Sequence, residues 1–386
     1  MGSAGYWGLV WFFASFPAFH FTDTLLIVGT AMLALGALLG ELHTTMGRWG
    51  LLSGLIALAA LLIGRRRSRA IWPGLEHALS GALGSDYRVG TTVQDRESHN
   101  PLEVRQAGVE RIADLPYGDA GVRNLLDLYR PVAAAGQSGL PILLWVHGGA
   151  WITGHKTQQG LPLMYSMAKR GWLVAGINYR LGPKSRFPEP LIDVKRAIAW
   201  LREHAAQFGG DPHFIIAAGG SAGGHLAALA ALTPNRPDYQ PGFEALDTAL
   251  AGAIPLYSRF DFIDRSNVLR RKQFLIKFLA DKVMPCAFEH DPQIWDQASP
   301  IAQVNSDAPP MFVLHGTHDS LIPMAEANAF VVALRRVSRQ PVVFAQLYGA
   351  QHAWDLLNTP WTRSTVNAVE RFALHLHAQY RQRQGI

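Results

Sequence analysis

A serine among very small residues is the sequence feature most able to do chemistry. Ser221 lies in the segment 219–224 (GGSAGG), directly after an apolar run at 214–218 and before a helical pattern at 225–232. A sharp turn from strand to helix exposes a serine hydroxyl for attack on a carbonyl carbon, and it requires small neighbours. A phosphate-binding loop is the alternative, but it needs a lysine after the glycines, which this segment lacks. We therefore predict that Ser221 is a nucleophile.

A nucleophilic serine needs a base, and the base needs an acid that orients it. Asp319 follows an apolar run at 311–314, and His352 follows another at 342–347. Because parallel strands end at the same edge of a sheet, we expect both side chains to lie beside Ser221. The order serine, aspartate, histidine along the chain is one in which such triads occur. We expect His315 and His318 to shape the loop of Asp319, because a metal site built from this pair lacks a third ligand nearby. If Asp319 is not the acid, Asp291 and Asp296 are the first alternatives.

A third motif supplies backbone donors. The segment 147–151 (HGGAW) follows an apolar run at 142–146. Glycines there allow backbone N–H groups to point at the oxyanion that forms when a serine attacks a carbonyl. We predict an oxyanion hole made by Gly148, Gly149 and Ala222. His147 is expected to be a structural hydrogen-bonding residue.

The elements that position these motifs follow from the hydrophobic pattern. From about residue 70, short apolar runs alternate with amphipathic stretches, which is typical of an α/β fold with a mostly parallel central sheet and helices on both faces. One helix is expected at 191–204, where apolar residues share a face. Strands are expected at 141–146, 172–177, 214–218, 251–256, 311–314 and 342–347.

A small cap insertion is expected at about 258–300. Basic residues alternate there with apolar residues at 274–276 and 278–279. We expect a cap helix whose apolar side lines an acyl pocket and whose basic side meets anionic headgroups. An ordinary amphipathic surface helix explains the same pattern equally well. The basic residues are Arg270, Arg271, Lys272, Lys277 and Lys282.

The N-terminal segment 1–64 has a different character. Uncharged, mostly apolar runs occupy 24–40 and 49–64, and an aromatic-rich run occupies 5–21. A membrane span needs about 20 apolar residues. Each run is a little short, but flanking Trp and Arg side chains can lie in the interface and extend it. We therefore predict two or three transmembrane helices, with membrane lipids as partners. The first run is either a third span or an interfacial helix. A buried hairpin of a soluble domain is the alternative, and a cleaved signal peptide fits less well because no basic segment precedes the apolar runs.

The charges that follow the apolar runs predict an orientation. Four arginines lie at 65–67 and 69, and such clusters favour the cytoplasmic side. We therefore expect a basic juxtamembrane linker at 65–100 and a catalytic domain at 101–386 that faces the cytoplasm. The net charge is +6, and residues 1–69, with five arginines and two acids, carry +3 of it. No clustered basic face remains for nucleic acid. The single cysteine, Cys286, excludes an intramolecular disulfide. The oligomeric state is not predictable from the sequence.

Together these motifs resemble the hormone-sensitive-lipase-like branch of carboxylesterases, and in particular the membrane-anchored esterases and lipases of actinobacteria. The resemblance covers about 124–375 and implies an α/β-hydrolase fold and hydrolysis of carboxylic esters or lipids without a metal or organic cofactor. Many members have a glycine in place of Ala150 and an acid in place of Gly220, which leaves the subfamily and the substrate open. The alternatives are an amidase, a formamidase or an acyltransferase with the same triad, and a non-catalytic membrane-tethered scaffold. The motifs that carry the resemblance are 126–131 (LDLYRP), 147–151 (HGGAW), 178–181 (NYRL), 186–188 (RFP), 219–224 (GGSAGG), 316–319 (GTHD) and His352.

Overall fold

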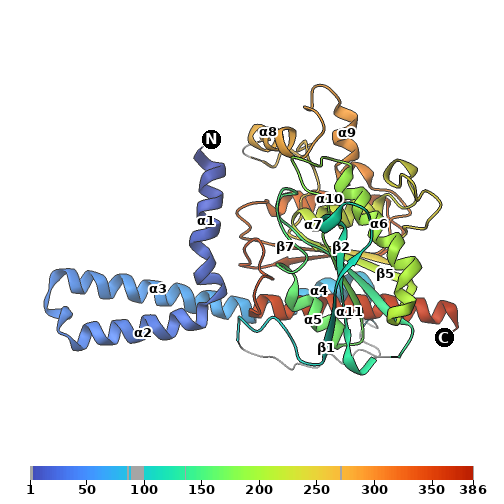
Figure 1. Ribbon diagram of the computed structural model, residues 1–386. Helices are drawn as coiled ribbons and strands as arrows, with labels where there is room; N and C mark the ends of the chain where they lie inside the picture. Colours follow the sequence, from blue (N-terminus) through green and yellow to red (C-terminus); the bar gives the residue numbers. More distant parts are fainter. Residues whose placement is uncertain (1–2, 85–86, 88–99, 135, 270–271, 386) are drawn as a thin grey trace.

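The computed structural model describes all residues except 1–2, 85–86, 88–99, 135, 270–271 and 386. Its centre is an eight-stranded sheet with the order β1-β2-β4-β3-β5-β6-β7-β8 (Figure 1). The first two strands are antiparallel to their neighbours, and strands β3 to β8 are parallel. The strands are β1 Val109–Pro116, β2 Leu125–Pro131, β3 Leu140–Val146, β4 Leu173–Ile177, β5 Gly210–Gly220, β6 Gly252–Leu256, β7 Met311–Gly316 and β8 Val342–Leu347.

All six strands expected from the sequence are confirmed as β3 to β8, and the mostly parallel sheet is confirmed with them. The antiparallel strands β1 and β2 were not predicted. The first is largely exposed, and the second contains Asp127, a fully buried charge. Arg111 and Lys156 each approach this carboxylate to 2.7 Å. The ion pairs make burial of the charge possible. The charged residue, however, interrupts the apolar run, so the hydrophobic pattern does not indicate a strand here.

Helices cover both faces of the sheet, as expected for this fold class. Side chains alternate along a strand, so Leu144 of β3 belongs to one apolar core and Trp145 to the other. The first core includes residues of α6, α7 and α10, and the second includes residues of α4, α5 and α11. The helix expected at 191–204 is confirmed within α6. The helices of this domain are α4 Trp72–Leu83, α5 Leu161–Lys169, α6 Glu189–His204, α7 Ala222–Leu232, α8 Lys272–Lys282, α9 Pro292–Gln297, α10 Met324–Val337 and α11 Pro360–Gln384.

The segment expected to be a linker is helical where it begins. The four arginines at 65–67 and 69 form the end of α3, and α4 follows after a short break. Leu75 and Leu79, four residues apart on one side of α4, are buried in the second core. The catalytic domain therefore begins before residue 101, because this helix covers part of its sheet; most of the remaining linker, 88–99, lies outside the described residues.

Three apolar helices precede the domain: α1 Ser3–His20, α2 Thr22–Leu38 and α3 Thr45–Arg69. The second and third run antiparallel as a hairpin that projects from the domain, whereas α1 leaves the base of the hairpin and lies beside the domain (Figure 1). The axis bends by 81° between α1 and α2. Within the described chain, one helix is long and apolar enough to cross a membrane, or two if the bent pair counts as one span.

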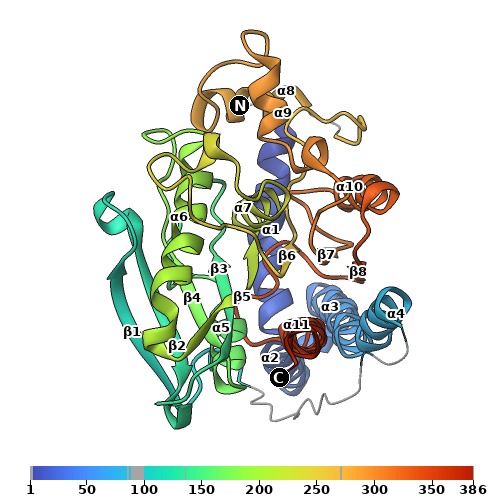
Figure 2. The same cartoon turned by 90° about the vertical axis from the view of Figure 1, so that its right-hand side faces the viewer.

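The insertion expected at 258–300 contains α8 and α9, which lie together beyond one edge of the sheet (Figure 2). Leu279 of α8 is fully buried, and the Arg186 guanidinium donates to the carbonyls of Ala280, Asp281 and Met284 at 2.7–2.8 Å. The apolar side of α8 thus packs on the domain, as an amphipathic helix requires. Arg270 and Arg271 lie outside the described residues.

Candidate active site

The predicted nucleophile lies on a tight turn between β5 and α7. Ser221 has φ 55° and ψ −120°, a backbone conformation that is strained for any residue with a side chain. The Ser221 N–H donates to the carbonyl of Leu256 on the neighbouring strand at 2.9 Å. A Cβ on Gly223 would clash with the carbonyl oxygens of Val146 and His147. The turn therefore depends on its small residues, as the sequence predicts.

The structure brings together the three residues predicted to form a triad. His352 Nε2 lies 3.1 Å from Ser221 Oγ, and His352 Nδ1 lies 2.7 Å from Asp319 Oδ2. The three residues come from the loops after β5, β7 and β8, at the carboxyl edge of the parallel strands. A neutral imidazole that donates Nδ1–H to the carboxylate leaves Nε2 free to accept a proton from the serine, which is the arrangement of a serine hydrolase.

The surroundings of Asp319 stabilise its charged form. Burial alone would raise the pKa of this carboxyl, but the electrostatic interaction with His352 and hydrogen bonds from His315 and His352 outweigh burial and lower the pKa below its ordinary value. The other oxygen, Oδ1, accepts the backbone N–H groups of Leu321 and Ile322 at 2.9 and 2.8 Å. The aspartate is thus fixed as an acceptor that faces His352.

The alternative acids lie in other environments. Asp291 caps the N-terminus of α9, and Asp296 forms an ion pair with Arg265. His315 donates to the Ile322 carbonyl at 2.9 Å and lies 3.4 Å from Asp319, which agrees with the expectation that it shapes the acid loop. Within the part of the chain that the structure describes, three or more His, Cys, Asp or Glu side chains do not gather in a way that fits a metal ion.

The glycine-rich loop after β3 lies next to the serine turn, because Val146 pairs with Gly219 across the sheet. Gly149 has φ +123°, and a Cβ at this position would clash with the Thr153 carbonyl oxygen. The Gly148 N–H, one of the three predicted oxyanion donors, instead donates to Gln159 Oε1 at 2.8 Å. Sequence analysis had no signal for this contact, because Gln159 lies beyond the motif on a loop.

Two buried histidines support the loop. His147 Nδ1 lies 2.7 Å from the Gly148 carbonyl, and its ring stacks on Tyr179 at 4.4 Å. Burial lowers the pKa of His147 to about 4, so this ring is neutral. His225, which was not singled out from the sequence, accepts from Trp151 Nε1 at 3.2 Å. Burial lowers the pKa of His225 as well, so both rings are neutral, and their contacts hold the loop in place.

A second carboxylate lies close to the triad and was missed by sequence analysis. The hydroxyl of Tyr257 donates to Asp355, and the Tyr257 ring lies 4.8 Å from the ring of His352. Any Cβ at Gly220 would clash with the Tyr257 hydroxyl. Burial raises the pKa of Asp355 to about 6. The glycine that departs from the family pattern therefore makes room for this tyrosine, and neither Tyr257 nor Asp355 belongs to a motif.

Comparison with known proteins places this chain in a family. The BD-FAE family model matches residues 126–334, more than half of the chain. The probable carboxylic ester hydrolase LipM of Mycobacterium tuberculosis is 41% identical over 79% of this chain and 72% of LipM. Esterase LipQ of the same organism is 44% identical over 71% of this chain and 63% of LipQ. The chain thus spans somewhat less than two thirds of LipQ.

Solved structures of esterases have the same architecture as this chain. A butyrate-bound esterase of Thermogutta terrifontis superposes with a TM-score of 0.57 at 24% identity, over 71% of this chain and 95% of that one. Esterase B of Lactobacillus Rhamnosis gives a TM-score of 0.60 at 18% identity, over 82% and 98% of the two chains. These likenesses establish the α/β-hydrolase esterase fold. The family model and the relatives at 41–44% identity show that the chain belongs to the BD-FAE family and is a carboxylic ester hydrolase.

Proposed function

We propose that this enzyme hydrolyses esters through a Ser221–His352–Asp319 triad and an acyl-enzyme intermediate. Ser221 Oγ attacks the ester carbonyl carbon while His352 Nε2 takes its proton, and Asp319 orients and stabilises the imidazolium. The observation that carries the proposal is that one histidine contacts both partners, at 3.1 Å and 2.7 Å. The bond between acyl carbon and alcohol oxygen then breaks, and the alcohol leaves with the proton from His352.

The second half of the cycle uses the same groups. Water gives a proton to His352 and attacks the acyl carbon, the bond to Ser221 Oγ breaks, His352 returns the proton to Ser221 Oγ, and a carboxylic acid leaves. The oxyanion of each tetrahedral intermediate is held by the N–H groups of Gly149 and Ala222. Gly148, the third predicted donor, is engaged by Gln159 and fixes the loop. A preorganised donor of this kind contributes about 10²–10³-fold to kcat.

We propose that α2 and α3 anchor the enzyme in a membrane as a hairpin. The run between Asp23 and Glu41 carries no charge, and at about 1.5 Å per residue it is about 25 Å long. An ion pair of 2.6 Å between Asp23 and Arg65 lies at the base of the hairpin, and Glu41 and Arg48 lie at its tip. The charges thus mark both ends of an apolar segment that is slightly shorter than the hydrocarbon core, a mismatch that membranes tolerate.

In this arrangement α1 is an interfacial helix and not a third span. Its bend of 81° from α2 lays it along the membrane plane when the hairpin crosses. Trp11 and Phe13 are exposed on α1, whereas Phe12 and Phe19 pack against the catalytic domain. Aromatic residues favour the headgroup region. The arginines at the end of α3 support a cytoplasmic position for the catalytic domain.

The mechanism is tested with full-length protein and p-nitrophenyl esters from acetyl to palmitoyl. We expect hydrolysis by the wild type and a comparable loss of kcat in Ser221→Ala and His352→Ala, because triad members act as a unit. An active His352→Ala variant would refute the proposed base.

The anchoring is tested by carbonate extraction of membranes, which should leave the protein in the membrane fraction. The orientation is tested by protease added to intact spheroplasts, which should spare the catalytic domain until lysis. Extraction by carbonate contradicts anchoring, and digestion in intact spheroplasts contradicts only the orientation.

A further inference from the structure

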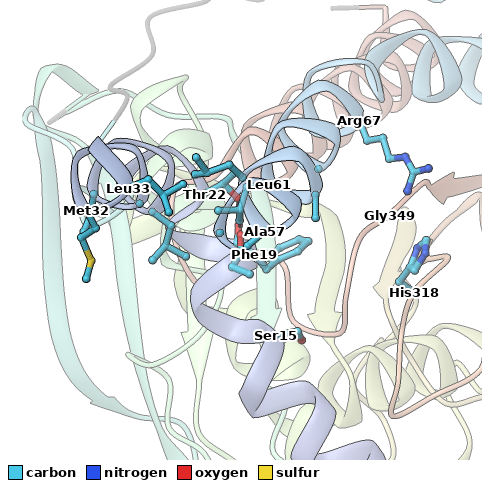
Figure 3. Close-up of a pocket in the computed structure, with 18 of the residues that line it drawn as sticks. Ser15, Phe19, Thr22, Met32, Leu33, Ala57, Leu61, Arg67, His318 and Gly349 are labelled. Carbon is cyan, nitrogen blue, oxygen red and sulfur yellow. Dashed lines mark hydrogen bonds between the residues drawn. The ribbon is translucent and has the colours of Figure 1, made fainter. Parts of the chain in front are cut away.

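An apolar groove of about 790 Å³ runs between the N-terminal helices and the catalytic domain (Figure 3). Its walls come from α1, α2 and α3, where Phe19, Met32, Leu33 and Leu61 contribute apolar side chains. The volume falls within the range of about 300–1,000 Å³ that is usual for ligand sites. The groove is therefore large enough for a ligand that is itself mostly apolar.

One end of the groove lies at the loops that carry the triad. His318 and Gly349 line it, and these residues lie one position before Asp319 and three before His352. Ser15 of α1 also lines it and accepts a hydrogen bond from Gln351, the neighbour of His352, at 3.4 Å. One end of the groove thus lies at the loops that carry Asp319 and His352.

The helix that closes the groove also touches the catalytic base. The ring of Phe12 on α1 lies 6.3 Å from the ring of His352, edge to face. Phe19, further along α1, stacks on Trp361 at 4.2 Å. These contacts join α1 to the domain both beside His352 and beside the groove.

The other walls of the groove belong to the hairpin that we place in the membrane. Ile27, Leu35, Leu55 and Ile56 on α2 and α3 are exposed, with 51–72% of their surface accessible. Residues of the same two helices line the groove, so it borders directly on the region that lipid chains occupy. The chemistry at the triad end is different, because Arg67 and His318 supply polar groups there (Figure 3). A ligand that fits has a long apolar tail and an oxygen-rich head.

We propose that this groove receives the acyl chain of a membrane lipid ester and that such a lipid is the substrate class of the enzyme. This inference rests on the proposed esterase function and membrane anchoring. The acyl chain of the lipid enters along α2 and α3 from the bilayer. The ester group of the lipid lies at the end of the groove marked by His318 and Gly349, beside the triad. The N-terminal helices then form part of the substrate site in addition to anchoring the enzyme.

A matched pair of alanines on α3 provides the test. Ala57 lines the groove, whereas Ala59, two residues further along α3 and also exposed, does not. Full-length Ala57→Trp and Ala59→Trp proteins in phosphatidylcholine nanodiscs are compared with p-nitrophenyl butyrate and p-nitrophenyl palmitate. Ala57→Trp should lower kcat/KM for palmitate at least tenfold and leave butyrate within twofold. Ala59→Trp should leave both substrates unchanged.

The outcomes separate this inference from the proposed function. If wild type hydrolyses butyrate and Ala57→Trp hydrolyses palmitate as well as wild type does, the groove is not the acyl site, although the esterase function stands. Failure of the wild type on every ester refutes the esterase function itself.

A second experiment locates the bound acyl chain directly. A fluorophosphonate with a sixteen-carbon chain and a terminal diazirine reacts with Ser221 and is then photolysed. Cross-links to peptides of α2 or α3 support the proposal, and cross-links confined to α8 in the cap overturn it.

Discussion

Replacement of Asp319 by asparagine probes the geometry of the triad with a minimal change in shape. The carboxylate uses Oδ1 to accept two backbone N–H groups and Oδ2 to face His352 Nδ1 at 2.7 Å. An asparagine whose oxygen keeps the two hydrogen bonds from the backbone N–H groups must point its NH₂ group at His352. Because NH₂ can only donate, Nδ1 must then accept, and the ring proton moves to Nε2 toward Ser221.

That tautomer cannot take the proton of the serine. The corresponding change in a serine protease triad lowers kcat by about 10⁴, which equals about 5.5 kcal/mol at about 1.36 kcal/mol for each factor of ten. If the amide turns the other way, its oxygen faces His352, but the N–H groups of Leu321 and Ile322 then meet an NH₂ group and lose their acceptor. Both orientations therefore cost activity.

The assay is the steady-state hydrolysis of p-nitrophenyl butyrate by wild type, Asp319→Asn and Asp296→Asn, with the melting temperature as a check on folding. We expect a fall in kcat of about 10⁴-fold for Asp319→Asn, a KM close to that of the wild type, and little change for Asp296→Asn, whose partner is Arg265. Activity of Asp319→Asn within tenfold of the wild type would refute the assignment of the acid.

Three further predictions concern Asp355, Gly149 and Arg186. Burial raises the pKa of Asp355 to about 6, so the fold prefers its neutral form. That contribution to stability is present below about pH 4 and is lost as the pH rises through 6. In urea unfolding between pH 4 and 7, the free energy of unfolding of the wild type should therefore fall by up to about 3 kcal/mol relative to that of Asp355→Asn. Parallel pH profiles of the two proteins would contradict this prediction. Gly149→Ala should lower kcat about 10²–10³-fold, because its φ of +123° and the nearby Thr153 carbonyl exclude a side chain and the proposed oxyanion donor would have to move. The control variant Gly171→Ala, at a φ of +95° with open space around it, should keep its activity. Arg186→Met removes the donor to three carbonyls of α8 and its C-terminal flank, so limited proteolysis within 258–300 should accelerate while the melting temperature changes little; unchanged cleavage contradicts this role for Arg186.

The sequence was most informative where function restricts residue types. The parallel strands were predictable because each is a short apolar run, and Ser221, Asp319 and His352 were singled out as candidates because each follows such a run. β2 was missed because its buried Asp127 depends on Arg111 and Lys156, which are distant in sequence. Long-range pairing of this kind leaves no periodic signal.

The details around the triad were less predictable for the same reason. Gly220 was noticed as a departure from the family pattern, but the sequence does not show that the hydroxyl of Tyr257, directly after β6, leaves no room for a side chain at this position. The contact of Gln159 with Gly148 likewise joins a motif to a loop residue without a pattern of its own. The angle between α1 and α2 was also out of reach, because apolar composition gives the length of a helix and not its direction.

The central claim is that Ser221 is the nucleophile, and the direct measurement is the site of covalent labelling. Full-length protein is treated with a fluorophosphonate, digested and mapped by mass spectrometry. We predict a single adduct on the Ser221 peptide, formed in the wild type and absent from Ser221→Ala, with both proteins showing the same melting temperature before treatment. An adduct on another serine, or equal labelling of Ser221→Ala, would contradict the mechanism.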